Sequence, residues 1–197
     1  MSRVKEYLFR KFISPIIQSE SSCKEISLGV GVGVFVALTP TEGFQAVLLF
    51  LSVLALRTFG IKADWKVGLP WLFLTNPTNI FPLYFLYYKT GNVFLAFLGG
   101  DKDLSSYQEI KMQILSSYGQ HGFTASLSAF WQALGVATFI GSFVYALPVS
   151  LFYYRLTSRF VDSIRNHGIH GNHDRAILLT FLASIVIPFL VWITGLA

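Results

Sequence analysis

Long apolar runs separated by short polar breaks dominate the first half of the chain. Residues 26–38 and 44–56 are two mainly apolar runs of thirteen residues each, and residues 39–43 between them read Thr-Pro-Thr-Glu-Gly. Thirteen residues make about 20 Å of helix, too short for a hydrocarbon core of about 30 Å. One straight helix over both runs would be too long, and Pro40 removes a backbone donor between them. The pattern therefore predicts a broken helical hairpin.

A second break of the same kind follows at residues 75–79, which read Thr-Asn-Pro-Thr-Asn. A short apolar arm precedes it and a longer one follows. We therefore expect two broken hairpins, over residues 26–56 and 65–98, as re-entrant units that face each other with their polar breaks at membrane depth. Non-helical backbone at that depth must be buried in protein or line a wet cavity.

Three further segments complete the predicted architecture, an all-α integral membrane protein. In residues 1–18 apolar side chains recur every fourth position among basic ones, which predicts an amphipathic helix that lies on the membrane surface or packs on the domain. A signal peptide is excluded because charges run too far in and no small-residue cleavage site follows. The membrane domain is expected over residues 22–160, with a spanning helix at about 129–154, and a last spanning helix over 176–197.

Composition and charge support a membrane location. Charged residues make up only 13% of the chain, where soluble domains carry about 25%. Basic residues gather at the N-terminus and between Arg155 and Arg175, so the positive-inside tendency places both in the cytoplasm of a multi-pass protein. We expect the bacterial inner membrane as location and membrane lipids as partners, with no nucleic-acid partner, since no basic-aromatic surface motif occurs.

Polar side chains at the two breaks are the candidate substrate-binding site. Helices that begin at membrane depth point unpaired N–H groups inward, and paired broken segments mark the sites of many transporters. The other interpretation is that these residues only cap the broken helices. The candidates are Thr39, Thr41, Glu42, Gly43, Gln45, Thr75, Asn76, Thr78 and Asn79, with Pro40 and Pro77 as structural residues.

Glu42 is the one acid in either break. An ionisable group at this depth is a functional candidate, for a cation or a proton, although a carboxylate in a first helical turn also complements the helix dipole. Gly29 and Gly33 form a small-xxx-small pair with a structural role, because it permits close helix approach within the chain or between protomers.

The sequence contains little that indicates a metal site, a cofactor site or a catalytic site. His167, His170 and His173 lie in one glycine-rich stretch that favours a solvated loop over a metal site, so we expect neither metal nor cofactor. No nucleophile elbow, phosphate-cradling loop or paired carboxylates occur, and we do not expect an enzyme.

Residues 22–91 resemble a bacterial family known as domain of unknown function 2062. The resemblance is carried by the glycine pair, both breaks and their neighbours, namely Gly29, Gly33, Phe35, Pro40, Gly43, Gln45, Asn76, Pro77, Pro82, Tyr84 and Gly91. The chain departs from the family pattern at Glu42 and Asn79 and adds a final helix after Arg175. The resemblance implies a small inner-membrane protein, and relatives fused to glycosyltransferase-like domains hint at work on envelope polysaccharide or lipid-linked species.

Two functions follow as hypotheses. The first is a small carrier or flippase-like protein for an anionic or polyol-bearing envelope species. The alternative is a non-transporting scaffold that docks envelope-synthesis enzymes of the glycosyltransferase type. Both hypotheses are compatible with a homo-oligomer. They differ in whether water reaches the polar breaks, as a carrier requires, or whether the breaks are packed within the protein.

Overall fold

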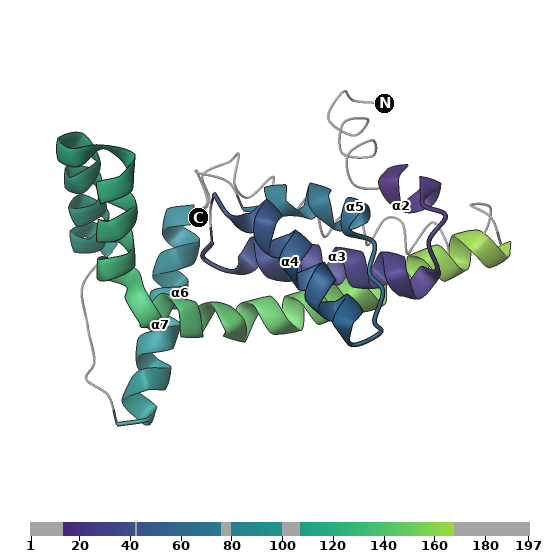
Figure 1. Ribbon diagram of the computed structural model, residues 1–197. Coiled ribbons are helices and arrows are strands. Elements are labelled where there is room, and N and C mark those ends of the chain that lie inside the picture. The colour runs from purple at the N-terminus through teal and green to yellow at the C-terminus, as the bar shows by residue number, and fades with distance from the viewer. Residues whose placement is uncertain (1–13, 42, 76–79, 100–106, 168–197) are drawn as a thin grey trace, which may run out of the picture. The chain divides into compact units, whose positions relative to one another are not determined.

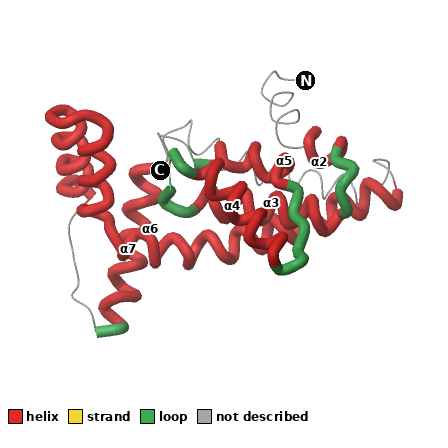
Figure 2. Tube along the Cα trace, viewed as in Figure 1, coloured by secondary structure: helices red, strands yellow, loops and turns green. Residues whose placement is uncertain are grey.

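The computed structural model describes residues 14–41, 43–75, 80–99 and 107–167, and every regular element within them is a helix (Figure 2). The all-α prediction is confirmed for this part of the chain. In order, the elements are α2 (Ser14–Gln18), α3 (Cys23–Leu38), α4 (Gln45–Thr58), α5 (Trp65–Gly68), the 3-10 helix η2 (Leu69–Leu74), α6 (Ile80–Phe97) and α7 (Tyr107–His167) (Figure 1).

The helices fall into two compact units, Met1–Thr75 with Ala146–Ala197, and Asn76–Tyr145. The first unit contains the predicted first hairpin as α3 and α4, with residues 39–44 between them. With 16 and 14 residues, these helices are about 24 and 21 Å long, both shorter than a hydrocarbon core of about 30 Å. The break therefore lies where the apolar pattern predicts it.

A capping box begins α3. The Ser22 side chain accepts a hydrogen bond from the Glu25 N–H, and the Glu25 carboxylate accepts one from the Ser22 N–H at 2.9 Å. Such a reciprocal pair satisfies two N–H groups that a helix start leaves without partners. The helix is therefore fixed at its polar end before the apolar run begins.

The short arm before the second break is not one regular α-helix. It begins as α5, which Asp64 caps by accepting from the Lys66 N–H at 3.1 Å, and it continues as the 3-10 helix η2. Pro70 lies in the first turn of η2. Because proline has no N–H to donate to the carbonyl of Lys66, the α-helical pattern cannot continue through it.

Glycines bring α3 and α5 into backbone contact. A Cβ atom added at Gly29 would lie 2.9 Å from the carbonyl carbon of Asp64, and one at Gly33 would lie 2.9 Å from the Cα of Gly68. Contacts below 3.0 Å are not tolerated by real Cβ atoms. The predicted small-xxx-small pair therefore faces a helix of the same chain.

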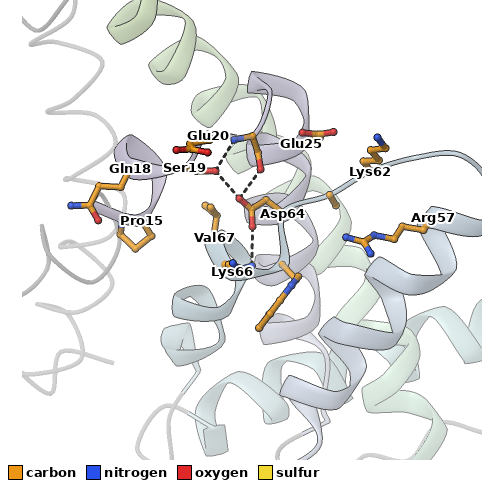
Figure 3. A pocket seen from close by; sticks show the side chains of 13 residues that line it. Pro15, Gln18, Ser19, Glu20, Glu25, Arg57, Lys62, Asp64, Lys66 and Val67 are labelled. Carbon is orange, nitrogen blue, oxygen red and sulfur yellow. Dashed lines mark hydrogen bonds between the residues drawn. The ribbon is translucent and has the colours of Figure 1, made fainter.

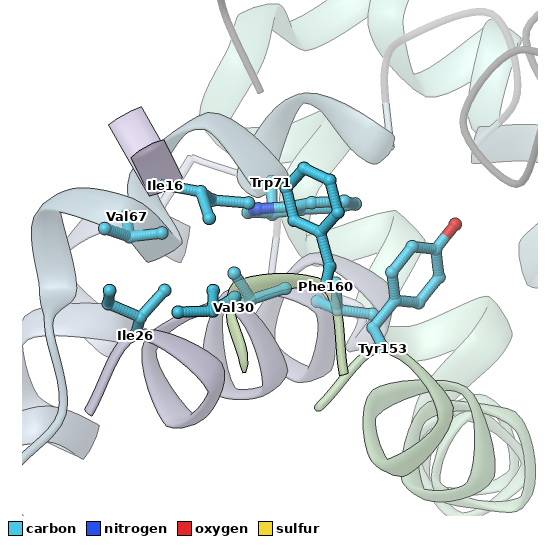
Figure 4. Close-up of a cluster of buried hydrophobic side chains, with 9 residues drawn as sticks. Ile16, Ile26, Val30, Val67, Trp71, Tyr153 and Phe160 are labelled. Atoms are coloured by element: carbon cyan, nitrogen blue, oxygen red, sulfur yellow. The ribbon is translucent and has the colours of Figure 1, made fainter. Parts of the chain in front are cut away.

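Apolar side chains of α2, α3, α5, η2 and α7 form the core of the first unit. Trp71 of η2 is fully buried and meets Tyr153 of α7 edge to face, with 4.9 Å between the ring centroids (Figure 4). Ile16, Val30 and Phe160 belong to the same buried cluster. The end of α7 thus packs against the hairpin arms that precede it by a hundred residues.

The second unit pairs α6 with a part of α7. Gly91 and Gly141 allow the close approach, since a Cβ at Gly91 would lie 2.5 Å from the carbonyl carbon of Ala137 and one at Gly141 2.7 Å from that of Tyr87. The Thr90 and Tyr145 hydroxyls share a hydrogen bond at 2.9 Å.

Helix α7 differs from the sequence prediction in its extent. We expected a separate spanning helix at about 129–154, but α7 runs from Tyr107 to His167, with Gly135 at φ +40° inside it. The segment Gly135–Asn166 is long and apolar enough to cross a membrane by length and composition, the one such helix among the described residues. The predicted last span at 176–197 and most of the amphipathic helix 1–18 lie outside the described residues.

Candidate functional site

The first break is an ordered turn held by its own polar groups. Thr39 ends α3 in an extended conformation, and its hydroxyl donates to the Val36 carbonyl at 2.8 Å. The Thr41 hydroxyl lies 3.2 Å from that of Thr39. Gly43 then has φ +85°, a left-handed conformation that glycine adopts without strain, and α4 begins two residues later.

Side chains from both predicted breaks meet at the C-terminal end of α3. The Gln45 amide nitrogen donates to the Thr75 hydroxyl at 3.0 Å and to the Ala37 carbonyl at 3.4 Å. The Thr75 hydroxyl donates to the same carbonyl at 2.9 Å. Ala37 is in the last turn of α3, where carbonyls have no intrahelical donor. The three groups together close the end of the helix, and we call them the junction.

The junction fixes the orientation of the Gln45 amide. A carbonyl only accepts hydrogen bonds, so the group that faces Ala37 must be the amide NH2. The amide oxygen of Gln45 therefore points away from the junction, and it accepts no hydrogen bond from any residue in the described ranges. Gln45 itself is half-buried.

Of the nine predicted binding residues, the structure brings four together as two pairs, Thr39 with Thr41 and Gln45 with Thr75. Thr39 and Thr75 are buried, whereas Thr41 and Gln45 are half-buried. Gly43 is exposed and opens α4. The remaining four, Glu42, Asn76, Thr78 and Asn79, lie outside the described residues, as does Pro77. Pro40 is buried within the first break.

A second polar site, which the sequence did not reveal, lies at the opposite end of α3. It is a cavity of about 570 Å³, and we call it the charged cavity. Its lining carries as many carboxylates as cations, and includes Gln18, Glu20, Glu25, Arg57, Lys62, Asp64, Trp65 and Lys66 (Figure 3). The sequence signal that could have indicated this site is the charged segment between the two apolar arms, which contains Arg57, Lys62, Asp64 and Lys66.

Asp64 organises one wall of the charged cavity. One carboxylate oxygen accepts hydrogen bonds from the hydroxyls of Ser19, at 2.7 Å, and Ser21, at 3.0 Å. Arg165 of α7 donates to the carbonyl of Ser21 at 2.6 Å. The linker between α2 and α3 is therefore held from two sides.

Two ionisable groups in the first turn of α3 are perturbed in opposite directions. Hydrogen bonds from the backbone and side chain of Ser22 lower the pKa of the Glu25 carboxyl. Burial and the hydrogen bond with Asp162 raise the pKa of the Cys23 thiol. Glu25 therefore stays ionised to lower pH, and Cys23 stays protonated to higher pH, than free side chains would.

No group of three or more metal-ligating side chains occurs among the described residues. His170 and His173, which the sequence placed near His167, lie outside them.

Fold and site together define a small all-helical protein with one candidate membrane span and an apolar hairpin. The chain belongs to the DUF2062 family, described as an uncharacterized protein conserved in bacteria, whose model matches residues 7–170. Comparison with curated proteins and with solved structures found no match. The match includes the junction and the charged cavity, and it ends before the predicted final helix.

Proposed function

We propose that this protein is a multi-pass protein of the bacterial inner membrane that acts as a small carrier or flippase-like protein. Its cargo would be an anionic or polyol-bearing envelope species, bound at the junction without a chemical step. The observation that carries this proposal is the amide oxygen of Gln45, which accepts no hydrogen bond from the described residues. It is a fixed acceptor at the end of two half-length apolar arms, so it suits a cargo that donates hydrogen bonds, as a polyol does.

The arrangement of the first unit supports a site within the membrane. Glu25, Arg57 and Lys62 lie at the end of α3 and α4 that carries the charged cavity. The junction lies towards the other end of α3, where Ala37 is about 18 Å from Glu25 along the helix axis. Polar breaks paired in this way hold substrate in many transporters. The residues 76–79 and Glu42 would complete such a site.

One observation favours the alternative, a scaffold for envelope-synthesis enzymes. The Gln45 amide and the Thr75 hydroxyl both donate inside the junction, and Thr75 is buried at 8% exposure. A purely structural junction that only caps the C-terminal end of α3 would have the same hydrogen bonds. The two proposals differ in whether the Gln45 oxygen meets a ligand.

Paired variants at the junction separate the two functions. Thr75→Val removes the bridge but leaves the Gln45 oxygen, whereas Gln45→Leu removes both. Wild-type protein would be purified from bacterial membranes, and its bound species would be extracted and identified by mass spectrometry. The carrier proposal expects a hydroxyl-bearing lipid-linked species that Thr75→Val largely retains and Gln45→Leu loses. Equal retention in both variants, or a copurifying enzyme with no such species, would favour the scaffold.

Water access provides an independent test. In a Cys23→Ser background, a cysteine at Thr41 would be probed with membrane-impermeant thiol reagents from each side. A water-filled path to the first break predicts labelling, and the labelled side identifies where the path opens. A folded, inserted protein that resists labelling from both sides would contradict the carrier proposal.

A further inference from the structure

The acids that line the charged cavity are largely engaged by the protein itself. Asp64 accepts hydrogen bonds from two serine hydroxyls and from the Lys66 N–H. Glu25 accepts the hydrogen bond of the α3 capping box. Glu20 is exposed, and it lies with Gln18 on the α2 side of the cavity (Figure 3). Among the described residues, Glu20 is therefore the one carboxylate of the lining that accepts no hydrogen bond and makes no ion pair.

The cations are engaged much less. Arg57, Lys62 and Lys66 make no ion pair within 4.0 Å in the described part of the chain. Lys62 acts on Glu25 only at longer range, where it helps to lower the pKa of that carboxyl. Arg57 and Lys62 lie together on the α4 side, across the cavity from Glu20 (Figure 3). The cavity thus offers a cationic side and an anionic side.

An exposed apolar stripe begins beside the cationic side. Phe50, Leu54 and Arg57 follow one another at spacings of four and three residues, so they share one face of α4. Phe50 and Leu54 are 54% and 48% exposed, and Phe50 meets Trp65 of the cavity edge to face at 6.5 Å. Trp65 lies between the charged groups and the apolar stripe, as tryptophan does at membrane interfaces.

We propose that the charged cavity binds a zwitterionic phospholipid with a primary amine in its headgroup. Arg57 and Lys62 would hold the phosphate, and Glu20 the ammonium, while an acyl chain lies along Phe50 and Leu54. The Glu20 carboxylate, which lies across the cavity from Arg57 and Lys62, favours a headgroup with both charges over a purely anionic one. A primary ammonium can donate hydrogen bonds to a carboxylate, which a quaternary amine cannot. This inference rests on the membrane location proposed above and not on transport.

Native mass spectrometry of the full chain in detergent would test the site. The protein would be titrated with phosphatidylethanolamine, phosphatidylcholine or phosphatidylglycerol of identical acyl chains. Phosphatidylethanolamine should bind best, and the double variant Arg57→Gln/Lys62→Gln should bind it about tenfold more weakly or worse, because charge-assisted hydrogen bonds to phosphate are lost. Glu20→Gln should weaken phosphatidylethanolamine but not phosphatidylglycerol.

Lys24→Gln is the matched control, because Lys24 is an exposed cation near the cavity that does not line it. It should bind all three lipids as the wild type does. Equal affinity for the three lipids, or an unchanged affinity in the Arg57/Lys62 variant, would overturn the proposal. Because these variants leave Gln45 intact, the result is independent of the junction experiment.

Discussion

Replacing Gly33 by alanine tests whether the backbone contact between α3 and α5 holds the first unit together. The added methyl group would lie 2.9 Å from both the Cα and the carbonyl carbon of Gly68, which are backbone atoms that cannot rotate away. Overpacking of this kind costs up to about 3 kcal/mol, and the better helix propensity of alanine returns about 1 kcal/mol. We expect a net loss of about 2 kcal/mol, or about 30-fold in the unfolding equilibrium.

Unfolding in mixed micelles with a rising mole fraction of sodium dodecyl sulfate would measure this loss. Trp71 is a suitable fluorescent reporter because it is fully buried in the core of the same unit. Gly31→Ala is the matched control. It has the same gain in propensity, but its methyl group would meet the Cβ of Tyr154 at 3.3 Å, so little strain is expected. Equal stability of the two variants would refute the reasoning.

Two further predictions concern the first turn of α3. Hydrogen bonds from Ser22 lower the pKa of the Glu25 carboxyl in the folded state. The ionised carboxyl therefore stabilises the fold at pH values above the pKa of Glu25 in the unfolded chain, about 4.3. This contribution is lost as the pH falls through the lower pKa of the folded state. The stability advantage of the wild type over Glu25→Gln should therefore shrink from pH 6 to pH 3 in the same unfolding assay, and a constant difference would contradict it. Burial raises the pKa of Cys23, so at pH 8 maleimide should react with it more slowly than with a cysteine at exposed Lys24 in a Cys23→Ser background, as measured by intact-mass labelling. Equal rates would show that the thiol is not perturbed.

Helix boundaries in the first unit could be predicted from the sequence because they depend on local chemistry. Each helix end depends on residues close to it in the sequence. Examples are the polar residues of the breaks and Pro40, which has no backbone N–H to donate. The 3-10 form of η2 was missed, although Pro70 was its signal. The full extent of α7 was also missed, because we expected a separate spanning helix that begins only at about residue 129.

Contacts between distant residues could not be derived in the same way. The pairing of Gln45 with Thr75 joins residues 30 positions apart, and that of Ser19 with Asp64 joins residues 45 apart. Periodicity indicates which face of a helix is apolar, but it does not tell which neighbour a polar side chain will meet. The sequence therefore identified Gln45 and Thr75 as candidate polar residues, but it did not show that the two side chains are hydrogen-bonded to each other.

The hairpin of α3 and α4 has a consequence for how the protein enters a membrane. Between Glu25 and Arg57 the sequence has one ionisable side chain, that of Glu42. In the membrane location proposed above, the translocation machinery would have no hydrophilic domain to move across the bilayer when the hairpin inserts. Desolvation of this one carboxyl would be the main electrostatic barrier. Biogenesis of this hairpin would then depend on lateral partitioning from the cytoplasmic leaflet, with both charged ends left where they were synthesised.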